Sequence, residues 1–385
     1  MQQFDLIVIG GGILGTFHAF HALNKGLKVA LIERNNRPQS ATVRNFGQVV
    51  PSGMDLKWQT YGRKSLEIYK ELQDKFDIKT VNNGSIYIAS NEEEFTLIEE
   101  LNAINKSNDY ESYLLTKEQC LQKYPSLNDS YCKAALFFPQ EISADPRYMI
   151  HAVHDLMKQD EKFDYISNTL IKEIDSSGFG CKITDHLGNM YQSDKVILCC
   201  GSEFETLYPE LFLNSDLELV KLQMLRLKSQ SSVHIPGNIL TGLTIRRYES
   251  FQDCPSYLSI KAKEDQSAYW KKWGVHILFK QEADGTIILG DSHEYSDVKN
   301  KDNIDYLIRE EVNSYFIEEG RKIMNLDTWE VETSWLGIYS QCKENDLYQY
   351  TVDGKVHIVT GIGGKGMTGS AGYSLEHINK IYGGN

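Results

Sequence analysis

The sequence predicts an α/β protein with two domains, one built on a parallel sheet and one an α+β domain built on a largely antiparallel sheet. The chain has 385 residues, of which 41% are apolar, enough for two hydrophobic cores. A strand–helix–strand pattern opens the chain, and similar strand patterns recur near residues 165–202 and 355–360. Because a strand-rich region separates these segments, we expect one domain to interrupt the other.

The opening pattern is a compact βαβ unit. Residues 5–9 form a continuous apolar run, which predicts a buried strand. Residues 13–25 have the pattern of a helix that ends at Gly26, and residues 28–32 form a second apolar run. Two apolar strands joined by a helix predict a parallel pair within a larger sheet.

Glycines fill the turn between the first strand and the helix. Gly10, Gly12 and Gly15 match G-x-G-x-x-G, and Glu33 follows Gly15 by 18 residues at the end of the second strand. Gly10 permits a tight turn, Gly12 lets a pyrophosphate approach the backbone, and Gly15 lets the helix pack on the strand. Glu33 can accept hydrogen bonds from ribose hydroxyls, so the pattern predicts a Rossmann-like domain that binds a dinucleotide.

The chain after Glu33 departs from the pattern of nicotinamide enzymes, which continue through further βα repeats. A long polar loop, "RNNRPQSATVRNFGQVVPSG", follows instead. The strand pattern resumes at residues 165–175, 193–202 and 355–360. We therefore predict a discontinuous nucleotide-binding domain from residues 1–80, 145–218 and 330–385, and a substrate-binding domain from residues 81–144 and 219–329.

A second glycine-rich turn lies near the C-terminus, in "GIGGKGMTGSAG", before a helix predicted over residues 367–382. It does not match the Walker A motif, because residue 359 is Val and Gly366 follows Lys365. A helix N-terminus together with Lys365 can instead face an anion that forms during a reaction. An ordinary glycine-rich turn is the alternative.

Charge and composition exclude several function classes. The net charge is −13, and no Lys/Arg-rich block is present, so nucleic-acid binding is not expected. The N-terminus lacks the pattern of a signal peptide, and no apolar stretch approaches the length of a transmembrane helix, which predicts a cytoplasmic protein. Seven cysteines without C-x-x-C spacing predict neither a disulfide framework nor a zinc site. We expect no metal centre.

The strand-rich region supplies candidate substrate-binding residues. Residues 243–248 are predicted as a strand, which places Arg246 and Arg247 on opposite faces, so that one of them faces the cavity. An arginine suits a carboxylate or phosphonate, whereas surface ion pairs are the alternative for both. The polar side chains that could complete this anchor are Tyr248, Tyr257, His276 and His293. His18, His21, His151 and His154 are predicted on helix surfaces.

These motifs, in this order along nearly the whole chain, resemble the D-amino-acid oxidase superfamily of FAD enzymes, which includes glycine oxidase, sarcosine oxidase and D-amino-acid dehydrogenases. The resemblance is carried by the N-terminal glycines with Glu33-Arg34, "TLIKEI", "VILCCGS", "DGTIILGDS", "SWLGI" and "GIGGKGMT". The segments "VRNFGQVVPSG", "IRRY" and "GDSHEY" are similar to a branch associated with aminophosphonate degradation.

The resemblance implies roles for individual residues. The loop from Thr42 to Val49 passes along the flavin ring, Ile171 contacts adenine through its backbone, and the strand that ends at Gly201 lies by the pyrophosphate. Gly337 stands where sarcosine oxidases link their flavin to a cysteine, which implies noncovalent FAD. At Lys365, relatives often carry a small, aromatic or His residue. The implied FAD-binding residues are Gly10, Gly12, Ile13, Leu14, Gly15, Glu33, Arg34, Val43, Arg44, Asn45, Phe46, Gly47, Ile171, Cys200, Gly201, Gly337, Gly363, Gly364, Lys365, Gly366, Met367 and Thr368.

The implied reaction is oxidation of the C–N bond of a small amine that carries a carboxylate or phosphonate, with hydride transfer to flavin N5 and hydrolysis of the resulting imine. The candidate catalytic residues are Arg246, Arg247, Tyr248, His276, His293 and Lys365. Oxygen or an electron carrier is the expected acceptor. One alternative is oxidation of a 2-hydroxy acid or hydroxyphosphonate, which needs a base such as His276 or His293. Another is a flavin-binding subunit or scaffold without catalysis. The oligomeric state stays open, a homo-oligomer included.

Overall fold

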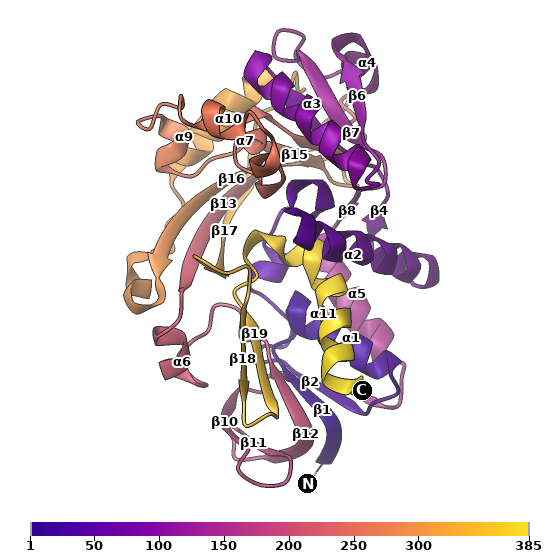
Figure 1. The fold of residues 1–385 in the computed structure, drawn as a ribbon, viewed down its shortest axis with the longest axis vertical. Helices are drawn as coiled ribbons and strands as arrows, with labels where there is room; N and C mark the ends of the chain where they lie inside the picture. The colour runs from indigo at the N-terminus through magenta and orange to yellow at the C-terminus, as the bar shows by residue number, and fades with distance from the viewer. Residues whose placement is uncertain (1, 384–385) are drawn as a thin grey trace.

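The computed structural model describes residues 2–383, which form two eight-stranded sheets and one three-stranded sheet. In Figure 1 the first sheet occupies the lower part of the molecule, near the N-terminus, and the second sheet occupies the upper part. The predicted fold class, a Rossmann-like domain with a second α+β domain on a largely antiparallel sheet, is confirmed.

The first sheet is parallel at its centre, as expected for a nucleotide-binding domain. Its strand order is β10-β11-β12-β1-β2-β9, with β19 beside the end of β12 and β18 beside β19. Strand β1 lies between β12 and β2, parallel to both. The strands are β1 (Gln2–Ile9), β2 (Val29–Ile32), β9 (Phe163–Ile166), β10 (Ile171–Asp175), β11 (Cys181–Asp185), β12 (Met190–Leu198), β18 (Tyr348–Val352) and β19 (Val356–Thr360). All three separated segments predicted from the sequence therefore meet in one sheet.

Four helices cover one side of this sheet and share its hydrophobic core. They are α1 (Ile13–Asn24), α2 (Leu56–Lys75), α5 (Pro146–Met157) and α11 (Gly366–Tyr382). Helix α1 packs between α5 and α11, and α11 packs also on α2. Because α1 and α11 both begin at glycine-rich turns after a parallel strand, their N-termini lie at the same edge of the sheet.

The second sheet has the order β17-β13-β16-β15-β14-β5-β7-β6 and is antiparallel except for the β14–β5 pair. Its strands are β5 (Ser85–Ala89), β6 (Tyr113–Thr116), β7 (Ala134–Phe138), β13 (Leu217–Leu227), β14 (Asn238–Leu240), β15 (Leu278–Gln281), β16 (Ile287–Asp297) and β17 (Val331–Cys342). The helices in its connections are α3 (Glu92–Ser107), α4 (Lys117–Lys123), α7 (Gly242–Ile245), α8 (Tyr257–Lys261), α9 (Tyr269–Lys272) and α10 (Glu310–Ile323), and α6 (Pro209–Leu213) precedes β13. Strand β17 extends this sheet, although the sequence placed residues 330–385 with the nucleotide-binding domain.

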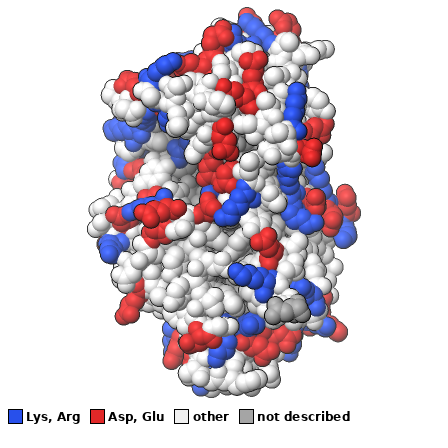
Figure 2. Space-filling model, in the orientation of Figure 1, with Lys and Arg blue, Asp and Glu red and all other residues white. Residues whose placement is uncertain are grey.

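A small sheet of β3 (Gln48–Val49), β8 (Ile142–Ala144) and β4 (Thr80–Val81) connects the loop after β2 to the segment that enters α5. Five short 3₁₀ helices complete the fold: η1 (Ala41–Val43), η2 (Pro51–Gly53), η3 (Glu249–Asp253), η4 (Val298–Asn303) and η5 (Gly363–Lys365). Across residues 2–383, we find no helix with the length and apolar character that crossing a membrane requires. On the face shown in Figure 2, basic and acidic side chains are interspersed.

Two local predictions are wrong. Residues 243–248 are not a strand: α7 ends at Ile245, and a turn leads from it into η3, so the alternation of faces does not apply. The histidines of α1 are not on a helix surface, because α5 and α11 cover α1 from both sides. His18 is fully buried and lies with its Nε2 2.9 Å from Nδ1 of His377, and His154 of α5 is also buried, 2.7 Å from the hydroxyl of Thr16.

Candidate active site

A cavity of about 690 Å³ lies between the two large sheets. Its walls come from the glycine turn before α1, the loop from residue 38 to 48, the end of β12, the end of β17 and the turn before α11. The second sheet and its connections contribute Arg247, Tyr248, Glu249, His276, Leu278, Asp291 and His293. The cavity therefore joins the predicted nucleotide-binding segments to the predicted substrate-binding region.

Gly10 and Gly15 in the first turn have the structural roles that the sequence predicts. Gly10 has a φ of +101°, and a Cβ there would lie 2.2 Å from the carbonyl oxygen of Cys199. A Cβ on Gly15 would lie 1.9 Å from the carbonyl oxygen of Gly10. At Gly12, by contrast, a Cβ would approach only the hydroxyl of Thr42, at 3.2 Å. Gly10 and Gly15 are thus required by the fold, whereas Gly12 keeps space open beside the cavity.

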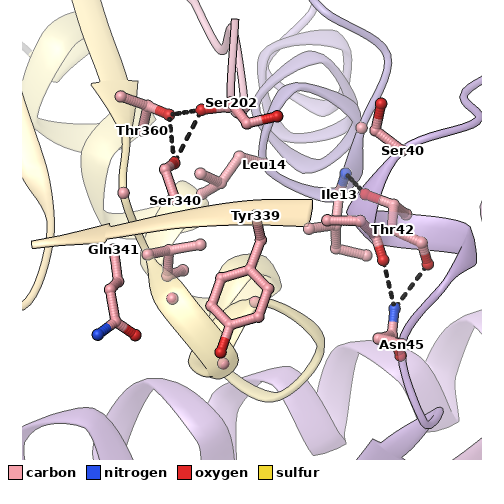
Figure 3. Close-up of a pocket in the computed structure, with 18 of the residues that line it drawn as sticks. Ile13, Leu14, Ser40, Thr42, Asn45, Ser202, Tyr339, Ser340, Gln341 and Thr360 are labelled. Carbon is pink, nitrogen blue, oxygen red and sulfur yellow. Dashed lines mark hydrogen bonds between the residues drawn. The ribbon is translucent and has the colours of Figure 1, made fainter. Parts of the chain in front are cut away.

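The N-terminus of α1 lies at this cavity. Its N-cap residue is Gly12, which offers no side chain to cap the helix. Thr42 accepts a hydrogen bond from the Ile13 N–H at 2.9 Å, and Asn45 donates to the Thr42 carbonyl at 2.6 Å (Figure 3). The loop after β2 is thereby fixed against the helix, and the positive end of α1 suits a phosphate.

The carboxylate of Glu33 stands at the end of β2, almost fully buried, in the cavity wall. One of its oxygens accepts from the Gly11 N–H at 2.9 Å, and the other accepts from the Asn35 N–H at 3.0 Å. The oxygen bound by the Asn35 N–H also accepts from Asn35 Nδ2 at 3.2 Å. These bonds fix the orientation of the carboxylate, and the oxygen bound by Gly11 keeps a second lone pair for a ribose hydroxyl.

The opposite wall is held together around Gly201. The hydroxyls of Ser340 and Thr360 both donate to the Gly201 carbonyl, at 2.8 and 2.7 Å (Figure 3). Gly201 has a φ of +63°, and a Cβ there or on Gly364 would have no neighbour within 4 Å. Bare backbone from three separated segments therefore faces one space, as a pyrophosphate site requires.

Most residues predicted to bind FAD line the cavity; Val43, Arg44 and Gly337 do not. Arg44 donates from Nη1 to the Leu336 carbonyl at 3.0 Å. It also packs against Gly337, because a Cβ added to Gly337 would lie 3.1 Å from the Cβ of Arg44. These residues brace the loop against β17 from outside. The cavity-lining set is Gly10, Gly12, Ile13, Leu14, Gly15, Glu33, Arg34, Asn45, Phe46, Gly47, Ile171, Cys200, Gly201, Gly363, Gly364, Lys365, Gly366, Met367 and Thr368.

Lys365 lines the cavity but is not a free cation. Its Nζ lies 2.9 Å from a carboxylate oxygen of Glu249 and 3.4 Å from one of Asp346. The two carboxylates compensate its charge, so the predicted role toward an anion is weakened.

The two candidate arginines lie in different environments. Arg246 is outside the cavity and pairs with Glu93 at 3.0 Å and Glu94 at 3.1 Å, so it is a structural residue. Arg247 lines the cavity, donating to the Gly274 carbonyl at 2.9 Å and to the Tyr295 hydroxyl at 2.7 Å. The two arginines therefore have different partners, and they lie at the end of a helical turn rather than on the opposite faces of a strand.

Within residues 2–383, no carboxylate oxygen lies within 4.0 Å of the Arg247 guanidinium. Its two protein partners are a carbonyl and a phenol, which accept hydrogen bonds but carry no full negative charge. Arg247 is therefore a cavity cation whose counter-charge the described protein does not supply at contact distance.

Three side chains meet beside Arg247. Nε2 of His276 lies 2.6 Å from one oxygen of Asp291, and Nε2 of His293 lies 3.9 Å from the other. Burial would raise the pKa of the Asp291 carboxyl, but His276, His293 and Arg247 together hold it well below its ordinary value. Burial and the Arg247 charge lower the pKa of His293 to about 3. At neutral pH, Asp291 is an anion and His293 a neutral acceptor.

The family model described as "FAD dependent oxidoreductase" matches residues 5–375. This chain belongs to that family. A glycerol 3-phosphate dehydrogenase of Caloramator mitchellensis is 23% identical over 387 residues, covering 98% of this chain and 73% of the relative. Glycine oxidase from Geobacillus kaustophilus has a TM-score of 0.77 at 14% identity over 99% of this chain and 95% of that one. L-α-glycerophosphate oxidase from Mycoplasma pneumoniae, with FAD bound, has a TM-score of 0.77 at 17% identity over 100% and 96%.

The residues of this oxidoreductase fit the cofactor that its family requires. A dinucleotide needs an uncapped helix N-terminus, backbone without side chains at the pyrophosphate and an acidic residue at the ribose. Gly12, Gly201, Gly364 and Glu33 supply these features within one cavity. The sequence-based prediction of FAD and of the D-amino-acid oxidase family is confirmed.

The cavity residues that sequence reasoning missed include Tyr339 and Asp291, and it did not foresee that Thr42 braces α1. Asp291 precedes His293 by two residues in a strand, so the alternation of side chains already places both on one face. That signal was available within "GDSHEY". Tyr257 was proposed for the anchor but is buried in α8, where its hydroxyl contacts the Arg246 carbonyl at 3.3 Å.

Proposed function

We propose that this FAD-dependent oxidoreductase oxidises the C–N bond of a small amine that carries a carboxylate or phosphonate. The observation that carries the proposal is the pairing of charges in one cavity wall. Arg247 is a cation without a carboxylate at contact distance among the described residues, and Asp291 is a buried anion. A zwitterionic substrate offers the complementary charge to each, whereas an uncharged one offers neither.

The two charges define how the substrate is held. The planar fork of Arg247 retains N–H groups beyond the two that bind Gly274 and Tyr295, and these suit two oxygens of an acidic group. Asp291 accepts hydrogen bonds from the substrate's ammonium group. The neutral Nε2 of His293 provides an acceptor for the amine proton that leaves before oxidation.

FAD, when bound, supplies the acceptor for the hydride that leaves the carbon beside the nitrogen. The protein's own contribution is to fix the substrate by both ends and to desolvate it. The imine product is hydrolysed to a carbonyl compound and an amine or ammonia. Oxygen or an electron carrier takes the electrons afterwards.

A second candidate is oxidation of a 2-hydroxy acid or hydroxyphosphonate. It is supported by His293, whose Nδ1 is held at 3.0 Å from the Gly274 carbonyl while Nε2 remains available as a base for the hydroxyl proton. The names of two relatives, which act on glycerol phosphate, point the same way. Against it stands Asp291, because a substrate with only negative charge would meet a buried anion.

An anaerobic substrate panel tests the proposal. We expect an amine with an acidic group to bleach the flavin, and expect neither its hydroxy analogue nor the amine without the acidic group to do so at the same concentration. In Asp291→Asn, the advantage of the amine over the hydroxy compound should fall by about 10-fold or more. Bleaching by the hydroxy analogue alone would establish the second candidate, and bleaching by none would favour a scaffold.

We further propose that FAD is bound noncovalently, because the resemblance to sarcosine oxidases puts Gly337 where their linking cysteine stands. Protein denatured by acid or heat should release a yellow supernatant that behaves as FAD on chromatography. Colour that remains with the precipitated protein after washing would contradict this.

A further inference from the structure

His276, Asp291 and His293 form a compact group of metal-ligand side chains. Each is at least 92% buried, and one ligand atom from each lies within 4.8 Å of the others. Asp291 and His293 project from the same face of β16. His276 lies opposite them, just before β15, and its backbone N–H donates to the Asp291 backbone carbonyl at 3.1 Å. Two imidazoles and a carboxylate are a ligand set found for transition metals and zinc.

Both imidazoles are oriented for ligation by hydrogen bonds on their other nitrogen. His293 Nδ1 lies 3.0 Å from the Gly274 carbonyl oxygen, and His276 Nδ1 lies 3.4 Å from the Thr244 hydroxyl. For His293, an Nδ1–H donated to the Gly274 carbonyl leaves Nε2 with its lone pair free, which is the tautomer that binds a metal. The two Nε2 atoms are directed at the same carboxylate.

The spacing of the ligand atoms suits a metal of ordinary size. Metal–ligand bonds of about 2.0 to 2.1 Å at tetrahedral angles place neighbouring ligand atoms about 3.3 Å apart. Nε2 of His276 lies 2.6 Å from one oxygen of Asp291, Nε2 of His293 lies 3.9 Å from the other, and one ligand atom from each residue lies within 4.8 Å of the others. Metal binding would therefore draw the three side chains closer together, and all three line the cavity.

We propose that His276, Asp291 and His293 bind a divalent metal ion of the zinc class in the substrate-free enzyme. The metal occupies the position that the substrate's ammonium group takes in the proposed function, but its binding does not depend on that function. Arg247, which lines the same cavity, opposes a dication, so this positive charge limits the affinity of the site.

Isothermal titration of the FAD-loaded, chelator-treated protein with Zn²⁺ tests the site. We expect one ion to bind per chain, and expect Asp291→Asn and His293→Asn each to weaken binding by about 100-fold or more, since each removes a ligand. His151→Asn and Asp155→Asn are matched controls, because these residues line a separate, smaller pocket. Both controls should bind Zn²⁺ as the wild type does.

Arg247→Met should change the Zn²⁺ affinity in the opposite direction. Removing the cation should tighten Zn²⁺ binding about tenfold or more, whereas Arg246→Met, whose charge is already paired, should leave it unchanged. The flavin spectrum and melting temperature establish that each variant is folded before titration. The proposal is overturned if the wild type binds no Zn²⁺, or if Asp291→Asn and His293→Asn bind it as tightly as the two controls.

Discussion

Gly12→Val should yield soluble, folded protein without its yellow colour. The backbone at Gly12 has a φ of −70°, which valine adopts without strain. The new Cβ would lie 3.2 Å from the Thr42 hydroxyl, and the branched methyl groups would enter the space beside the N-terminus of α1. Overpacking of about 3 kcal/mol at the pyrophosphate position would weaken FAD binding about 100-fold. The ratio of flavin to protein absorbance measures the loss.

Two further variants separate cofactor loss from misfolding. Gly178→Val has no neighbour within 4 Å of the new Cβ and lies outside the cavity, so it should keep full flavin content. Gly10→Val is not a useful substitute, because its Cβ would meet the Cys199 carbonyl at 2.2 Å and the turn itself would be lost. Added FAD should raise the melting temperature of Gly178→Val and leave that of Gly12→Val unchanged. Normal flavin content in Gly12→Val would mean that the glycine motif is only structural.

The fold could be predicted where the apolar pattern of a segment matches its burial in the folded sheet. The apolar runs of β1 and β2 and the glycines between them determine a βαβ unit within about 30 residues. The later strands β12 and β19 could be assigned because each contains an apolar run that a glycine follows within three residues. Strand β17 pairs with β13 in the second sheet, although its residues were predicted with the nucleotide-binding domain. Its closeness in sequence to the last segment does not determine which sheet it joins.

The segment from Leu243 to Tyr248 shows the limit of the period-2 pattern. The first four residues, Leu-Thr-Ile-Arg, alternate in polarity, which fits a short strand as well as a helical turn. In the structure the first three of these belong to α7, which begins at Gly242, and η3 follows. The meeting of His276 with Asp291 also could not be predicted, because it depends on the pairing of β15 with β16. His276 and Asp291 are 15 residues apart in the sequence, and no helical or strand periodicity predicts contact at that separation.

Arg247→Met should nearly abolish flavin reduction by an amine that carries an acidic group, while FAD stays bound. Arg247 lines the cavity and, in the described chain, has no carboxylate within 4.0 Å, so the substrate's acidic group is its counter-charge in the proposed function. Loss of such a charge-assisted contact costs about 2 to 5 kcal/mol, or roughly 30-fold to several thousand-fold in kcat/KM for flavin reduction. Stopped-flow spectroscopy at limiting and saturating substrate measures it.

Arg246→Met is the matched control, because it removes the neighbouring arginine and affects stability instead. Its guanidinium compensates Glu94, which is 4% exposed, and breaking a buried pair costs about 3 to 5 kcal/mol of folding free energy. We therefore expect a lowered melting temperature with near-normal reduction kinetics below it.

An amine without an acidic group should be oxidised equally slowly by Arg247→Met and by the wild type, since it makes no contact with the arginine. If Arg247→Met reduces its flavin at the normal rate with the acidic substrate, the acidic group is held elsewhere in the cavity.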